Sequence, residues 1–147
     1  PVALAKAAAR IPPGFLAEMR ERLEDAIAHA ETIEGPTLDR LEQDMHVTLL
    51  SHCGNHTLMQ AITMPQSLLI AHRFLYRWTP RLFETEPFLA EHMEILEHLG
   101  AGSVDTAAAA LERHLKGSGS RALARVDVIR REFRPESLPY LERLEDN

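Results

Sequence analysis

The sequence is poor in the features that mark disulfide-linked, membrane-spanning or nucleic-acid-binding proteins. Its 147 residues include a single cysteine, Cys53, so no disulfide can form within the chain, which fits a reducing, cytoplasmic environment. No apolar run approaches the roughly 20 residues that span a bilayer, so we expect no membrane segment. The formal net charge of −6 argues against a broad nucleic-acid-binding surface on this chain.

Aromatic residues are also scarce, at 5% of the chain, so leucine, alanine and isoleucine must fill most of a core. There is no strand-like alternation of apolar and polar residues, no hairpin turn pair and no internal repeat. Apolar residues recur instead at the spacing of helices. We therefore predict a single all-α domain over residues 1–147, built as an antiparallel bundle of six to seven helices.

Glycine and proline divide the chain into these helices. We expect helices over about 1–9, 14–32, 37–52, 56–78, 87–100 and 103–134. Gly35 and Pro36 are expected to end the second helix, and Thr37 to cap the third. Pro65 is expected to kink the fourth, Ser103 to cap the last, and residues 134–140 to be extended.

The stretch from Arg121 to Arg134 carries five arginines against Asp127 and Glu132. Such a run can form a basic docking face. A short charge run is more often the solvated face of a helix, and we interpret this one in that way.

Histidine is the residue type that stands out, with eight copies. His46 follows Glu42 by four residues, so the two side chains share one helix face. His92 and His114 each fall on the apolar, core-facing stripe of their own helices. A buried imidazole needs a hydrogen-bond partner or a metal, because leaving it unpaired costs about 1–3 kcal/mol. Glu42, His46, His92 and His114 are therefore candidate metal ligands at the centre of the bundle.

Three imidazoles and one carboxylate suit a divalent transition metal such as Zn, Ni, Mn or Co rather than Ca or Mg. Four protein ligands leave two positions of a six-coordinate ion open, for a small carboxylate or for a catalytic water. Helix phase alone leaves a structural role open for each histidine. The remaining histidines lack a matching carboxylate and phase, and we interpret them as surface or structural residues: His29, His52, His56, His72 and His98.

Two runs of the sequence carry a further pattern. LEQDMHVTL at 41–49, followed by Cys53-Gly54-Asn55 and Leu58, is similar to D-x-x-F-H-x-x-L…G-N-x-x-L. His92-x-x-Ile95-x-x-x-Leu99-x-x-Gly102, followed by an alanine-rich stretch and His114-Leu115, is similar to H-x-x-I-x-x-A-x-x-x-G-D…A…H-L. Over residues 1–115 the chain thus resembles the FCD domain, the C-terminal effector-binding domain of FadR-type GntR transcription regulators.

The resemblance implies a helical bundle in which one carboxylate and three histidines hold a metal ion in a central pocket. Carried over by position, these ligands are Glu42, His46, His92 and His114, with Glu42 one methylene longer than the family's usual aspartate. It also implies a small organic-acid effector, a homodimer, no enzymatic activity, and DNA binding only through an N-terminal winged helix-turn-helix. Nothing in this chain resembles that DNA-binding domain, and we expect the chain to be a fragment of a longer protein.

Two residues are candidates for effector binding. Asn55 matches the family's asparagine after glycine, and either faces the pocket or serves as a turn residue. Arg73 is a candidate partner for an effector carboxylate or else a surface arginine. The family's first-helix arginine, which helps hold an acidic effector, falls before Pro1.

Two other classes of function fit the same residues. One is a helical-bundle metalloenzyme similar to the DinB proteins, in which a metal-bound water acts as nucleophile. The other is a metal-free helical interaction module with structural histidines. Because the chain offers no further base, nucleophile or phosphate-binding loop, we favour the sensor.

Overall fold

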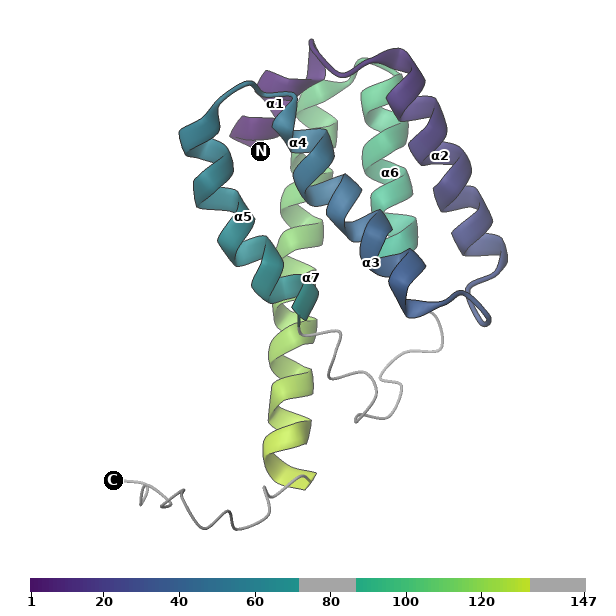
Figure 1. Ribbon diagram of the computed structural model, residues 1–147, viewed down its shortest axis with the longest axis vertical. Helices are drawn as coiled ribbons and strands as arrows, with labels where there is room; N and C mark the ends of the chain where they lie inside the picture. The colour runs from purple at the N-terminus through teal and green to yellow at the C-terminus, as the bar shows by residue number, and fades with distance from the viewer. Residues whose placement is uncertain (72–86, 133–147) are drawn as a thin grey trace.

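The computed structural model describes residues 1–71 and 87–132, so Arg73 and the segment 134–140 lie outside the described residues. Within them every regular element is helical (Figure 1). The elements are α1 (Val2–Ala8), α2 (Pro13–Ala28), α3 (Gly35–Gln43), the π-helix η1 (Asp44–Thr48), α4 (Leu49–Ser51), α5 (His56–Ala71), α6 (Phe88–Gly100) and α7 (Val104–Glu132). The all-α prediction is therefore confirmed. Since α3, η1 and α4 follow one another without a break, they form one continuous helical unit.

The longest helix, α7, organises the bundle. Its N-terminal part packs against α1, α5 and α6, and its last turns extend past the ends of the other described helices (Figure 1). Aliphatic side chains fill the space between the helices, as the low aromatic content requires. Buried members include Leu4, Leu23, Leu41, Leu49, Ile95 and Leu111. None of the described helices is both long enough and apolar enough to serve as a membrane span.

The turn between α6 and α7 brings these two helices together in antiparallel order. Gly102 adopts a left-handed conformation with φ of 72°, which costs glycine little and other residues more. The N–H of Gly102 bonds to the carbonyl of Leu99 at 3.0 Å, and the N–H of Ser103 bonds to that of His98 at 2.8 Å. This pair of bonds satisfies two of the last carbonyls of α6. Ser103 directly precedes α7, as predicted.

The boundary between α2 and α3 differs from the prediction. The second helix ends at Ala28 rather than near Thr32, and Gly35 and Pro36 begin α3 instead of ending α2. Thr37 therefore lies inside the first turn of α3 and does not cap it. The physical reason lies in Pro36, because its missing N–H has no intrahelical acceptor in a first turn and costs nothing there.

Candidate metal centre

Three histidine side chains from three helical segments meet in the core. His46 comes from η1, His92 from α6 and His114 from α7, and they are exposed by 2%, 0% and 2%. Their Nε2 atoms form a nearly equilateral triangle. The distance is 3.1 Å from His46 to His92, 3.0 Å from His92 to His114, and 3.1 Å from His46 to His114. The sequence prediction that these three side chains converge is therefore confirmed.

This triangle has the dimensions of a metal-ligand set. Because the three sides are almost equal, each Nε2 stands equally far from its two neighbours and is paired with neither in preference. An ion about 2.1 Å from three nitrogens, at bond angles near 90°, holds those nitrogens roughly 3.0 Å apart. The ligand atoms of His46, His92 and His114 all lie within 4.8 Å of one another, so one ion can contact all three.

Glu42 adjoins the histidine trio, defined as His46, His92 and His114. Its carboxylate places Oε2 3.5 Å from Nε2 of His46 and Oε1 3.6 Å from Nδ1 of His92. The side chain is 12% exposed. The four-residue spacing therefore brings Glu42 beside His46, as predicted, and its carboxylate also reaches the ring of His92.

A π-helical turn lets Glu42 and His46 both face inward. Along this helical unit and just after it, buried residues recur every four positions in two rows: Leu41, Met45, Leu49 and Cys53 form one, and Glu42, His46 and Leu50 form the other. In an α-helix of 3.6 residues per turn, a four-residue repeat drifts by about 40° per turn. The π-turn holds one extra residue and offsets this drift, since the N–H of Leu49 bonds to the carbonyl of Asp44 five residues earlier.

Asp44 points away from the trio, because it lies two residues before His46 and so falls on another face of the helix. Its Oδ2 accepts a hydrogen bond from Arg22 Nη1 at 2.8 Å, and its Oδ1 accepts one from Thr48 Oγ1 at 2.9 Å. Asp44 therefore anchors η1 to α2 and offers no ligand atom to the centre.

A second carboxylate, Glu91, holds the outer side of His114. Oε2 of Glu91 lies 2.6 Å from Nδ1 of His114, which donates the hydrogen bond. Arg121 donates hydrogen bonds to both oxygens of the same carboxylate, with Nη1 2.9 Å from Oε1 and Nη2 2.7 Å from Oε2. Because a neutral imidazole carries one N–H, this bond leaves the lone pair of Nε2 facing His46 and His92.

The environment favours the neutral form of His114 and the ionised form of Glu91. Burial and the nearby His46 lower the pKa of His114 below its usual value, against the opposing effect of Glu91. Burial raises the pKa of Glu91, but hydrogen bonds and positive charge from Arg121 and His114 outweigh it, so the pKa lies below its usual value. A neutral His114 is the form that can bind a metal.

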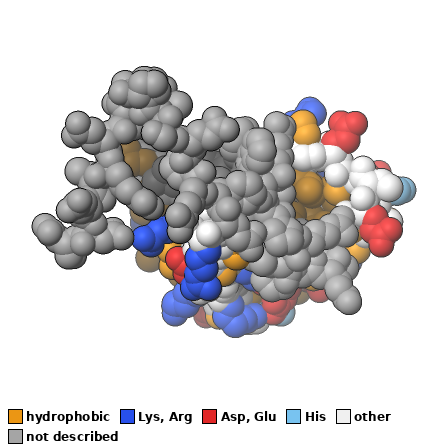
Figure 2. Space-filling view, turned by 90° about the horizontal axis from the view of Figure 1, so that it is seen from below, with side chains coloured by type: hydrophobic (Ala, Val, Ile, Leu, Met, Phe, Trp, Pro, Cys, Tyr) orange, Lys and Arg blue, Asp and Glu red, His pale blue; other side chains and the backbone are white. Residues whose placement is uncertain are grey.

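The sequence interpretation missed Glu91 and Arg121. The charge pattern predicts that Arg121 and Arg125 lie on a solvated face, but the Arg121 side chain is 17% exposed and Arg125 is 1% exposed. Arg121 follows His114 by seven residues, two helical turns, and this shared face is the signal that could have found it. Arg130 and Arg131 are exposed, as interpreted. Figure 2 shows basic and acidic side chains side by side on the end of the molecule viewed there.

Of the two predicted effector residues, only Asn55 lies among the described residues, and its side chain is used locally. Oδ1 of Asn55 accepts the backbone N–H of Leu58 at 2.9 Å, so the exposed Asn55 caps α5. The turn role is one of the two roles predicted for Asn55. Its other predicted role, contact with an effector, stays a prediction. Arg73 lies outside the described residues, and its role stays a prediction too.

The other described histidines lie away from the centre, as predicted. His29 is exposed and contacts Asp25, and His52 packs edge-on against Phe15 with ring centroids 5.4 Å apart. His98 lies 3.7 Å from Glu94 on the same helix. His72 lies outside the described residues.

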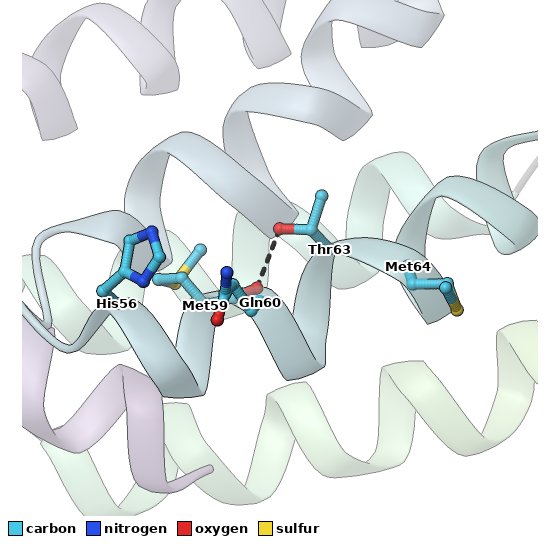
Figure 3. A pocket seen from close by; sticks show the side chains of 5 residues that line it. All are labelled: His56, Met59, Gln60, Thr63 and Met64. Carbon is cyan, nitrogen blue, oxygen red and sulfur yellow. Dashed lines mark hydrogen bonds between the residues drawn. The ribbon is translucent and has the colours of Figure 1, made fainter.

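A separate surface pocket of about 430 Å³ runs along α5 (Figure 3). Its lining residues are His56, Met59, Gln60, Thr63 and Met64. Thr63 Oγ1 donates a hydrogen bond to the carbonyl of Met59 at 2.8 Å, so this hydroxyl is already used within the helix. Since the histidine trio does not line this pocket, it is distinct from the candidate metal centre.

Comparison with known protein families shows a match to the FCD domain. The model of the FCD domain matches residues 1–117, a range that contains Glu42 and all three histidines of the trio. No curated protein and no solved structure matches the chain.

Proposed function

Because the chain belongs to the FCD domain family, we propose that it senses a small organic acid through a divalent transition metal bound by Glu42 and the histidine trio. FCD domains are the effector-binding domains of GntR-type transcription regulators, so membership of the family supports a regulatory rather than an enzymatic role. The metal, the class of effector and the ligand residues are the proposed part.

The observation that carries the metal proposal is the triangle of buried Nε2 atoms, with sides of 3.0 to 3.1 Å. Three imidazole nitrogens that face one another in a core cannot all satisfy one another, because a neutral ring has at Nε2 either one hydrogen or one lone pair, and each polar group left unsatisfied costs about 1–3 kcal/mol. A shared cation removes that cost for all three at once. The nitrogen-rich donor set suits Zn, Ni or Mn, with Glu42 supplying the negative charge beside it.

Each ligand residue has a distinct task in this proposal. The trio binds the ion through Nε2, and Glu42 contributes a carboxylate from the same helix as His46. When bound, the ion supplies Lewis-acidic positions that the oxygens of a small carboxylate can occupy. The trio is almost fully buried in the core, and this burial limits the access of water.

The position of the site explains how binding there is transmitted. Because η1, α6 and α7 each contribute one histidine, a ligand bound at the centre can change how these three segments are arranged relative to one another. A ligand shifts such an arrangement only through different affinities for its two states. In a cytoplasmic homodimer, we propose, this shift alters the spacing of N-terminal DNA-binding domains outside this chain.

The proposal is tested in two steps on the purified chain. Elemental analysis without added metal is expected to find stoichiometric Zn, Ni or Mn, and His92→Ala is expected to lose it. The metal-loaded protein is then titrated with hydroxy acids, sugar acids and amino acids while its melting temperature is followed. A wild-type protein that neither contains nor takes up metal contradicts the metal centre, and a metal-loaded protein that responds to no acid contradicts the sensor.

A further inference from the structure

The Nδ1 atoms of His114 and His46, which lie on the outer side of the trio, differ in their hydrogen bonding. Nδ1 of His114 donates to Oε2 of Glu91 at 2.6 Å. Nδ1 of His46, by contrast, is buried and has no hydrogen-bond partner among residues 1–71 and 87–132. His114 is therefore the member of this pair whose ring is held from behind by a carboxylate.

This hydrogen bond selects one tautomer of His114. With its hydrogen on Nδ1, the ring presents a bare lone pair at Nε2, toward the other two histidines. With its hydrogen on Nε2, the ring would point an N–H into the space that the ion needs. A carboxylate behind a ligating histidine also raises the basicity of the ring and fixes its orientation.

Glu91 is itself held in place by α7. Arg121 contacts both of its carboxylate oxygens, at 2.9 and 2.7 Å, and also donates to Ser118 Oγ at 3.1 Å. The Glu91 and Arg121 side chains are 28% and 17% exposed, so solvent competes weakly for this planar, two-point contact. Gly117 leaves room for the guanidinium, since a β-carbon there would stand 3.0 Å from Nη1 of Arg121.

Resting on the proposed metal centre, we infer that Glu91 and Arg121 are positioning residues that fix the tautomer and orientation of His114 and so set the metal affinity of the site. Glu91 acts on the ring directly, and Arg121 acts through Glu91. Neither residue supplies a ligand atom. The pair also links α6 to α7, so it joins the metal centre to the helix that extends farthest from the bundle.

The chain contains a matched control for this pair. Arg113 and Glu94 also connect α7 to α6, with Nη2 2.6 Å from Oε1, but neither residue hydrogen-bonds a histidine of the trio. Glu91→Gln and Arg121→Gln are compared with Glu94→Gln and Arg113→Gln for zinc affinity, measured by competition with a chelator. The first two are expected to raise the Kd for zinc about 10–100-fold, and the controls to leave it unchanged.

A second measurement does not depend on metal. Nitrogen-15 NMR of the imidazole rings in the metal-free protein is expected to show His114 with its hydrogen on Nδ1, and a shift toward the other tautomer in Glu91→Gln. Arg121→Lys keeps the charge but loses the two-point contact, so an intermediate zinc affinity is expected.

The outcomes separate the two proposals. A wild-type chain that binds no zinc contradicts the metal centre, while the NMR comparison still tests the role of Glu91. Wild-type zinc affinity in Glu91→Gln, with an unchanged His114 tautomer, overturns the positioning role. A lower melting temperature of Glu91→Gln, with zinc affinity and the His114 tautomer both unchanged, would assign the pair a merely structural role. That result also overturns the positioning role.

Discussion

In α7 the guanidinium of Arg121 lies over the backbone of Gly117, one turn earlier, with Nη1 3.0 Å from the position of a β-carbon at residue 117. Gly119, on the same helix, has no atom within 4 Å of that position. The two glycines therefore share a helix but differ in what lies above them.

Alanine substitutions at these two positions are expected to have different effects. Gly119→Ala is expected to raise the free energy of unfolding by about 0.5–1 kcal/mol, because alanine loses less backbone entropy in a helix. Gly117→Ala gains the same propensity but displaces Arg121 from Glu91, so it is expected to stabilise less and to weaken metal binding. Urea denaturation and zinc titration measure both, and equal zinc affinities in the two variants contradict the explanation for Gly117.

Bound metal is expected to stabilise the fold. At a free zinc concentration 100 times the Kd, binding to the native state adds about 2.7 kcal/mol. For a chain of this size that corresponds to a rise in melting temperature of roughly 5–10 °C. Thermal denaturation with zinc and with a chelator measures the difference. His46→Ala is expected to abolish it, while His29→Ala, at an exposed position, retains it. A zinc effect of the same size in His46→Ala would exclude that residue as a ligand.

Glu42 is expected to matter less than a histidine ligand. Its carboxylate lies 3.5 Å from Nε2 of His46, at the edge of the nitrogen triangle. Glu42→Gln keeps the shape but removes the charge, and we expect it to weaken zinc binding while retaining a site, because the three imidazole ligands remain. Chelator competition compares it with His92→Ala, which is expected to bind no zinc. Wild-type affinity in Glu42→Gln would leave a three-histidine site.

The metal-free protein is expected to lose stability as the pH falls below about 6.5. Burial and the nearby His46 lower the pKa of His114 in the folded state. Below the unfolded value, near 6.5, the unfolded chain takes up a proton that the folded chain resists, so stability falls with decreasing pH. Above that value this group contributes no pH dependence.

The measurement is urea denaturation of chelator-treated protein between pH 8 and pH 5.5. One such group produces a slope of at most about 1.4 kcal/mol per pH unit. His114→Gln is expected to flatten the curve, and His29→Gln, the exposed control, to leave it unchanged. Equal stability of the wild type at pH 7 and pH 5.5 would contradict the lowered pKa.

Much of the fold follows from local signals in the sequence. The extents of α1 and α6 match the expected helices closely, because proline and glycine at their ends act on the neighbouring backbone alone. The α2–α3 boundary was wrong because Gly35 and Pro36 can end one helix or begin the next, and the packing of α3 decides which. The π-turn at Asp44–Thr48 was not predicted, although the four-residue spacing of the apolar residues Leu41, Met45 and Leu49 can be read from the sequence.

The inward direction of the three histidines could be predicted for the same local reason. Helix phase depends on neighbouring residues, so His92 and His114 could be assigned to core-facing stripes without knowing the partners of those stripes. The phase of a residue on its own helix does not determine how far along the bundle axis its side chain lies. It also does not determine how one helix is rotated relative to another.

The sequence by itself determined a chain of helices, their apolar faces, and the histidines that those faces carry. Only the tertiary structure decided that Nε2 of each histidine meets the other two within 3.1 Å, and that Glu91, not Glu42, holds the outer nitrogen of His114. The reason is physical: helix phase is set by neighbours a few residues apart. The meeting of Glu91 with Arg121, 30 residues away, depends on how α6 and α7 pack together.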